Sequence, residues 1–178
     1  MMGCRHPPDS QHPGARGRYS LWLAAALGSL ALAASPAARA FVRCRVSASG
    51  VAFGIYDPSS SSPLASTGSV TTTCTLFGRR SVTVGLTSSL STGSSGSYVN
   101  RTMRSGASAL LYNLYLDWND TQIAGDGTAG TFTGGAMLSL TGSNRVGRLT
   151  EPLYGLMPAR QDVPPGTYAD TIVVTVNY

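Results

Sequence analysis

Few residues in this chain could perform acid–base or nucleophilic chemistry. The 178 residues include two histidines, His6 and His12. A Ser-His-Asp or Cys-His mechanism needs a base that accepts a proton near neutral pH, and no histidine follows residue 12. Four acids, Asp57, Glu151, Asp162 and Asp170, are scattered and lie mostly beside turn signals, which favours turn hydrogen bonds over a paired-carboxylate site. We therefore predict no catalytic residue, no enzyme activity and no cofactor.

One acidic cluster could be considered for a metal ion. Asp117, Asn119 and Asp120 lie close together, and Asp126 follows between two glycines. A calcium loop needs about six oxygen ligands and commonly ends in a bidentate Glu, which is missing here. We expect a tight loop stabilised by Asp and Asn side chains, and no metal site.

Two cysteines follow residue 40, Cys44 and Cys74. In an exported chain such a pair is typical of a disulfide, with two free thiols as the alternative. In the chain-entropy model, closing a loop of this length contributes roughly 3 to 4 kcal/mol.

The N-terminal segment has the pattern of a secretory signal. Residues 1–20 are basic, residues 21–34 form an apolar run too short to span a membrane, and Ala38-Arg39-Ala40 has the small-x-small pattern of a cleavage site. We predict a signal peptide at residues 1–40, one exported domain at residues 41–178, and no stable membrane insertion.

The charge of the predicted mature chain is modest. Residues 41–178 contain nine arginines and seven acids, a net charge of +2. This gives little support for a nucleic-acid partner. Arg79 with Arg80, and Arg101 with Arg104, are too sparse for such a partner, and we expect each of them on the solvated surface.

The hydrophobic pattern predicts an all-β domain of seven or eight antiparallel strands packed as a sandwich. We expect one long first strand bent at Gly50 and a mobile Gly/Ser loop at residues 87–97. The other predicted strands are residues 67–76, 81–86, 98–103, 109–116, 128–133, 136–140 and 152–157.

The chain ends on a strongly alternating strand. Ile172, Val174, Val176 and Tyr178 fall on one face, and the residues between them fall on the other. This strand is either enclosed within a sheet or borders an empty strand position. The choice between these two arrangements decides the function.

Several segments together resemble the spore coat protein U domain family, which includes the subunits of archaic chaperone-usher pili. Their order and spacing carry the resemblance more than any one of them does. The segments are residues 44–58, 70–75, 112–117, 125–127, 154–155 and 166–178.

The resemblance implies an immunoglobulin-like sandwich that lacks its final strand. In pili of the family that the chain resembles, a periplasmic chaperone lends a strand to the open groove, and the N-terminal extension of another subunit later replaces that strand through an outer-membrane usher. The implied location is the periplasm and then the cell surface, in a fibre or a coat with roles in adhesion and biofilms. The residues assigned to the groove are Val51, Phe53, Ile55, Ile172, Val174, Val176 and Tyr178.

The chain departs from the pilin pattern before Cys44. A donor strand needs about ten alternating residues there, and the predicted cleavage leaves Phe41, Val42 and Arg43. We expect a strand acceptor that is not a donor, which favours a terminal, tip-like or coat subunit. The alternative function is a self-contained secreted module that binds a carbohydrate or surface ligand through Trp118 and tyrosines 112, 115, 154, 168 and 178.

Overall fold

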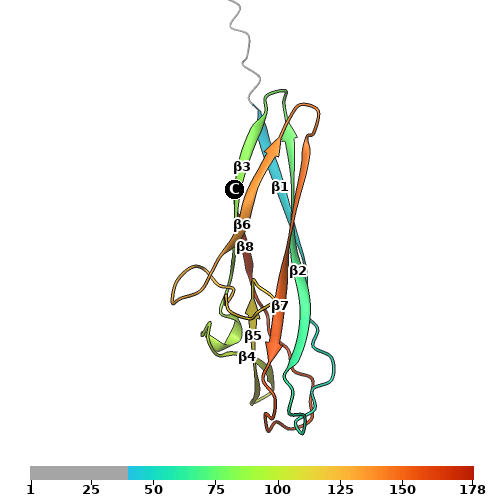
Figure 1. Cartoon of the computed structure of the whole chain (residues 1–178), viewed down its shortest axis with the longest axis vertical. Coiled ribbons are helices and arrows are strands. Elements are labelled where there is room, and N and C mark those ends of the chain that lie inside the picture. Colours follow the sequence, from blue (N-terminus) through green and yellow to red (C-terminus); the bar gives the residue numbers. More distant parts are fainter. Residues whose placement is uncertain (1–39) are drawn as a thin grey trace, which may run out of the picture. The chain divides into compact units, whose positions relative to one another are not determined.

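The computed structural model describes residues 40–178, which fold into eight β-strands and one short 3-10 turn (Figure 1). The signal-peptide prediction falls almost wholly on residues 1–39, outside the described part, and stays a prediction. The elements are β1 (Phe41–Ser49), β2 (Leu64–Phe77), β3 (Val82–Leu90), η1 (Gly93–Ser95), β4 (Arg101–Ser105), β5 (Ser108–Tyr115), β6 (Gly134–Leu140), β7 (Val146–Met157) and β8 (Val174–Asn177).

The strands form two antiparallel sheets. One has five strands in the order β1-β2-β7-β5-β4, and the other has three in the order β6-β3-β8. This confirms the predicted antiparallel, immunoglobulin-like β-sandwich. Strand β5 lies between β4 and β7, in agreement with its apolar residues on both faces.

Strand β2 illustrates why the sequence forms this sandwich. Val70, Thr72, Cys74 and Leu76 are buried, and the threonines between them lie on the outer face. Period-two alternation of β-branched residues fits a pleated surface with one face against a core. Cys44 is the cross-strand partner of Cys74 in β1, and the predicted disulfide joins these two residues.

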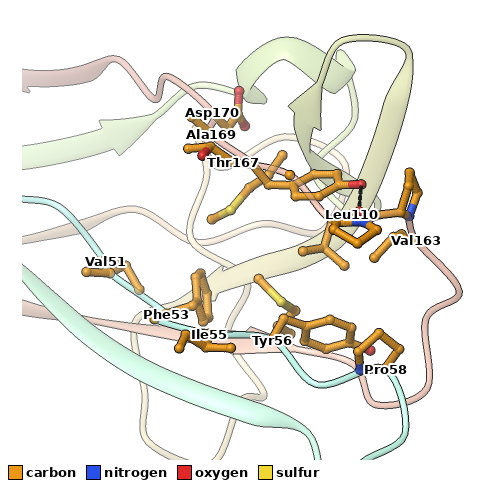
Figure 2. A pocket seen from close by; sticks show the side chains of 18 residues that line it. Val51, Phe53, Ile55, Tyr56, Pro58, Leu110, Val163, Thr167, Ala169 and Asp170 are labelled. Carbon is orange, nitrogen blue, oxygen red and sulfur yellow. Dashed lines mark hydrogen bonds between the residues drawn. The ribbon is translucent and has the colours of Figure 1, made fainter.

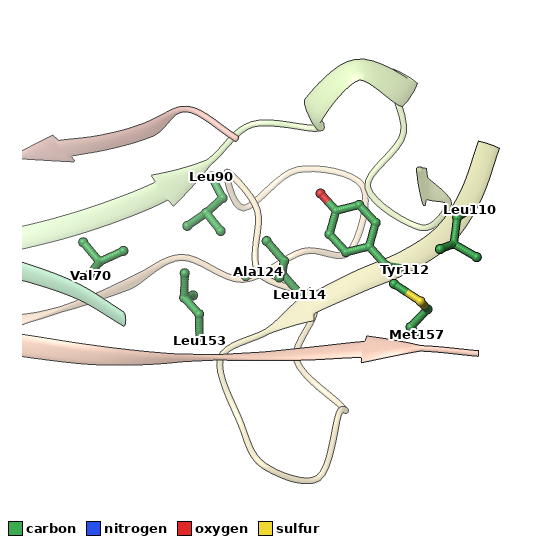
Figure 3. Packing of buried hydrophobic residues seen from close by; sticks show 8 residues of the cluster. All are labelled: Val70, Leu90, Leu110, Tyr112, Leu114, Ala124, Leu153 and Met157. Atoms are coloured by element: carbon green, nitrogen blue, oxygen red, sulfur yellow. The ribbon is translucent and has the colours of Figure 1, made fainter. Parts of the chain in front are cut away.

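The core between the sheets consists of two clusters. The cluster shown in Figure 3 contains Val70, Leu90, Leu110, Tyr112, Leu114, Ala124, Leu153 and Met157. The second contains Cys74, Leu76, Val84, Leu86 and Leu140, and it packs against Val42 of β1 and Val176 of β8. Both sheets contribute to each cluster, so the apolar contacts hold the two layers together.

Three local predictions are wrong. Strand β1 ends at Ser49, so residues 51–56 are not a bent continuation of it. Residues 87–97 are not one loose loop, because β3 continues to Leu90, which is only 3% exposed, and η1 follows. Residues 128–133 form no strand and take part in one isolated bridge, Ala124 with Phe132. Glycine and serine content misled the second prediction, since burial of Leu90 outweighs low strand propensity.

Candidate functional site

The last strand has a partner on one side only. Residues Val174–Asn177 of β8 pair with Thr87–Leu90 of β3, and β8 is the edge of its sheet. Strand β1 is likewise an edge, because it pairs with β2 alone. An edge strand presents unpaired backbone N–H and C=O groups that can accept another strand.

The chain leaves the sheet after β1 and crosses the inner face of its neighbours. Val51 and Phe53 lie over Gly155 of β7, where a Cβ atom would come within 2.6 Å of Val51 Cγ1 and 2.7 Å of Phe53 Cζ. The missing side chain at Gly155 therefore makes room for this crossing. Ser66 Oγ donates a 2.6 Å hydrogen bond to the Ala52 carbonyl and holds the crossing segment in place.

Opposite this segment lies the stretch that leads into β8. Arg104 of β4 and Ala169 exchange two backbone hydrogen bonds of 2.9 and 3.1 Å, and Tyr168 Oη donates to the Pro164 carbonyl at 2.9 Å. Residues 163–170 are thus attached to the β4 side of the sandwich, and their other side remains open.

Between the two segments lies a cavity of about 700 Å³. Figure 2 shows Val51, Phe53, Ile55 and Tyr56 along one wall and Thr167, Ala169 and Asp170 along the other. Its apolar lining residues are Val51, Phe53, Ile55, Tyr56, Met103, Leu110, Met157, Val163 and Tyr168. A cavity of this size and lining suits apolar side chains.

Asp170 anchors the open wall. Its carboxylate accepts hydrogen bonds from Tyr112 Oη at 2.7 Å, Ser94 N at 2.9 Å and Thr171 N at 2.8 Å. Partial burial by itself would raise the pKa of Asp170, but these donors favour the ionised form and leave the pKa below its usual range. Burial and the contact with Asp170 raise the pKa of the Tyr112 hydroxyl, so Tyr112 remains a donor.

The structure separates the predicted groove residues into two groups. Val51, Phe53 and Ile55 line the cavity, although Ile55 is 94% exposed. On and before β8, Ile172, Val174 and Val176 are half-buried against the core, and Tyr178 is 61% exposed. A role for these seven residues in strand binding stays a prediction.

Some residues of the cavity were missed. Met103 and Leu110 are cross-strand partners in the β4–β5 hairpin, and Val163 lies in the Pro-rich segment before the last strand. The hydrophobic alternation of the hairpin indicates that Met103 and Leu110 face inward. Nothing in the sequence indicates that this pair faces Val163.

The prediction of a solvated Arg101 is wrong. Its side chain is 0% exposed and donates to Asn113 Oδ1 at 2.8 Å and to the carbonyls of Ser91 and Ala124 at 2.9 and 2.7 Å. Its guanidinium lies 5.2 Å from the centre of the Tyr98 ring. Burial lowers the pKa of Arg101 from its ordinary value. These bonds join β4, β5 and two connecting loops.

The acidic loops have the expected local structure. Asp117 accepts hydrogen bonds from the backbone N–H groups of Thr121 and Gln122, and Asp126 accepts one from Thr128. Such bonds stabilise turns. Among residues 40–178, no three His, Cys, Asp or Glu side chains form a group that could hold a metal ion.

The aromatic residues proposed as a ligand platform lie in different environments. Tyr112 is in the core, Tyr168 lines the cavity, and Trp118 is 75% exposed in the loop after β5. In the part of the chain that the structure describes, no helix is sufficiently long and apolar to cross a membrane.

Comparison with protein-family models identifies the family of this chain. The family model described as Spore Coat Protein U domain matches residues 30–175. The chain belongs to the spore coat protein U family. Within this family it is 35% identical to Protein U of Myxococcus xanthus over 133 residues, which cover 71% of this chain and 70% of that protein.

One similar solved structure is the chaperone–tip adhesion subunit pre-assembly complex, CsuC-CsuE, from the archaic chaperone-usher Csu pili of Acinetobacter baumannii. The TM-score is 0.45 at 20% sequence identity. The match covers 78% of this spore coat protein U family chain and 40% of the matched chain.

Proposed function

We propose that this protein is an exported, non-enzymatic structural or adhesive surface subunit that is completed by a strand from a periplasmic chaperone or a fellow subunit. The observation that carries the proposal is the apolar cavity between residues 51–58 and 163–170, which lies beside the sequence that leads into the unpaired edge of β8. Membership of the spore coat protein U family supports a surface role.

The physical basis is β-strand addition. Backbone groups of an added strand would pair with β8, and alternate side chains would enter the apolar space beside it. Burying about four apolar side chains would contribute roughly 6 to 12 kcal/mol before ordering costs. Without an added strand, the same edge would favour aggregation.

The start of the domain supports acceptance of a strand rather than donation. Phe41, Val42 and Arg43 pair with Phe77, Leu76 and Thr75 of β2, so these residues already belong to the sheet. Because they pair within their own domain, these three residues are not free to pair with another subunit. A terminal, tip-like or coat position is the proposal that follows.

A pair of substitutions on β8 tests strand acceptance. Val176 points toward the core and Thr175 points outward on the same strand. Val176→Asp should abolish co-purification with the chaperone, because it places a charge where an apolar side chain packs. Thr175→Asp introduces the same charge on the outer face and should retain capture. Equal capture of both variants would contradict the proposed groove.

The alternative, a self-contained binding module, makes the opposite prediction for the whole domain. Such a module would be a soluble, stable monomer when it is expressed without a chaperone or donor peptide. Size-exclusion chromatography of the domain expressed alone separates the two functions.

A further inference from the structure

The end of the sandwich where β1 begins brings three chain segments together. A Cβ atom on Gly78 would lie 3.0 Å from Ala40 Cα, and one on Gly142 would lie 3.3 Å from the Arg79 carbonyl oxygen. Residue 40, the β2–β3 connection and the β6–β7 connection therefore meet here. Figure 1 shows this end at the top, opposite β4 and β5; we name it the β1 end.

The β1 end concentrates positive charge. Six of the nine arginines after residue 40 lie on it, all exposed, and residues 40–50, 69–90 and 134–150 contain no Asp or Glu. The six are Arg43, Arg45, Arg79, Arg80, Arg145 and Arg148. The nearest acid along the chain, Glu151, accepts a hydrogen bond from Ser88 of the opposite sheet. Apart from Glu151, the arginines thus have no acidic side chain in their own segments.

Strand register places several of these arginines on one face. Arg45 pairs with Thr73, which pairs with Arg148, while the neighbouring Cys44 and Cys74 point inward. Arg45 and Arg148 therefore project outward from strands on either side of β2, about 10 Å apart at two strand spacings. Arg43 lies on the same face, two residues before Arg45.

Apolar side chains lie among these charges. Phe41 and Phe77 stack at 4.8 Å between ring centres and are 55% and 41% exposed, and Val146 is 55% exposed. All three belong to the outward face at the β1 end, because their neighbours Val42, Leu76 and Gly147 point inward. The result is an exposed apolar patch bordered by arginines.

We propose that the β1 end docks peripherally on an anionic phospholipid surface. The guanidinium groups would contact lipid phosphates, and Phe41, Phe77 and Val146 would enter the boundary between headgroups and acyl chains. Basic side chains are attracted to anionic leaflets, and apolar side chains add affinity by leaving water. This surface is separate from the cavity, so the proposal does not rest on strand acceptance.

Other occupants explain less of this surface. A polyanionic chain such as DNA or a sulfated glycan would match the arginines but gain nothing from exposed Val146. A second copy of the domain would need an acidic patch, yet Asp117 and Asp126 are engaged in hydrogen bonds within their own loops. A lipid surface accounts for both the charge and the apolar side chains.

Vesicle sedimentation of the full exported protein tests the proposal. We expect binding to vesicles of phosphatidylglycerol and phosphatidylcholine, no binding to phosphatidylcholine alone, and weaker binding as salt rises. Arg43→Gln/Arg148→Gln should weaken binding about 25-fold, at roughly fivefold per arginine. The matched variant Arg104→Gln/Arg160→Gln has the same net charge but changes exposed arginines elsewhere, and it should bind like the wild type.

A second pair of variants tests the apolar contact. Phe77→Ser should reduce binding to the anionic vesicles about tenfold. Trp118→Ser removes a still more exposed aromatic side chain from the loop after β5 and should have no effect. The proposal would be overturned if the protein did not bind the anionic vesicles, if the two double-arginine variants lost binding equally, or if Phe77→Ser bound as tightly as the wild type. Tight binding to heparin or DNA without binding to vesicles would also overturn it.

Discussion

At the scale of single residues, Arg101 is a buried charged side chain that holds several segments together. Its hydrogen bonds to Asn113, Ser91 and Ala124 satisfy an amide oxygen and two backbone carbonyls that have little access to water. A buried acceptor without its donor costs about 1 to 3 kcal/mol. The carbonyl dipoles, the Tyr98 ring and the negative charge of Asp170 favour the protonated guanidinium.

Arg101→Gln should therefore lower the free energy of unfolding by about 3 kcal/mol, because a shorter amide cannot reach all three acceptors. Urea denaturation of the purified protein measures this loss. Arg104→Gln, at an exposed position three residues further along β4 and on its opposite face, should change stability by less than about 0.5 kcal/mol. A loss of similar size in both variants would indicate a general effect of charge.

The lowered pKa of Asp170 should make the stability of the folded protein fall at acid pH. Its pKa in the folded protein lies below its usual value, so folding favours the ionised form. The stabilisation is fully present above the unfolded pKa of about 3.9 and is lost as pH falls through the lower folded pKa. Asp170→Asn should be less stable than the wild type at pH 7, and the difference should shrink toward pH 2. Thermal unfolding across that range measures it, and a constant difference would contradict the assignment.

At the scale of elements, the path of residues 50–56 depends on two glycines beneath it. Gly155 and Gly68 leave space on the inner face of β7 and β2 for Val51. The segment continues the alternation of β1 in sequence but crosses the sheet instead of extending it. One wall of the cavity is consequently built from a segment that is no longer part of a sheet.

Gly155→Val should displace that segment, since its Cβ alone would lie 2.6 Å from Val51 Cγ1. Overpacking of this kind costs about 1 to 3 kcal/mol. Gly50→Ala is the matched control, because a Cβ there meets nothing within 4 Å. Thermal denaturation compares the two variants. Strand capture should also weaken in Gly155→Val alone, and an unaffected Gly155→Val would show that the segment tolerates a shift.

At the scale of the whole molecule, the two sheets are unequal, with five strands facing three. The last strand, β8, pairs with only the final four residues of β3, Thr87–Leu90. The inner face of the larger sheet therefore extends beyond what the smaller sheet covers. A partner strand would complete the smaller layer.

An added donor peptide with alternating apolar residues should raise the melting temperature of the domain in a concentration-dependent manner. A ligand that binds only the folded state stabilises it by about 2.7 kcal/mol at one hundred times its Kd. The control is a peptide of the same composition with the alternation scrambled. Equal shifts from both peptides would contradict a register-specific groove.

The sequence by itself predicted the layered β architecture, the disulfide and the Asx-stabilised loops. Each of these depends on local pattern: period-two alternation, cysteine pairing in an exported chain, and side chains that bond their own backbone. The family resemblance, carried by short segments spread along the chain, is likewise a property of the sequence, and the family comparison confirms it.

Only the tertiary structure decided which distant segments meet. Three features depend on contacts between residues far apart in sequence. They are the path of residues 51–56 away from β1, the burial of Leu90 and Arg101, and the cavity between residues 51–58 and 163–170. Local propensity cannot specify such contacts, because packing free energy overrides it wherever a side chain finds a partner. The terminal strand could be recognised from its alternation, but its unpaired edge follows from the strand order of the folded sheets.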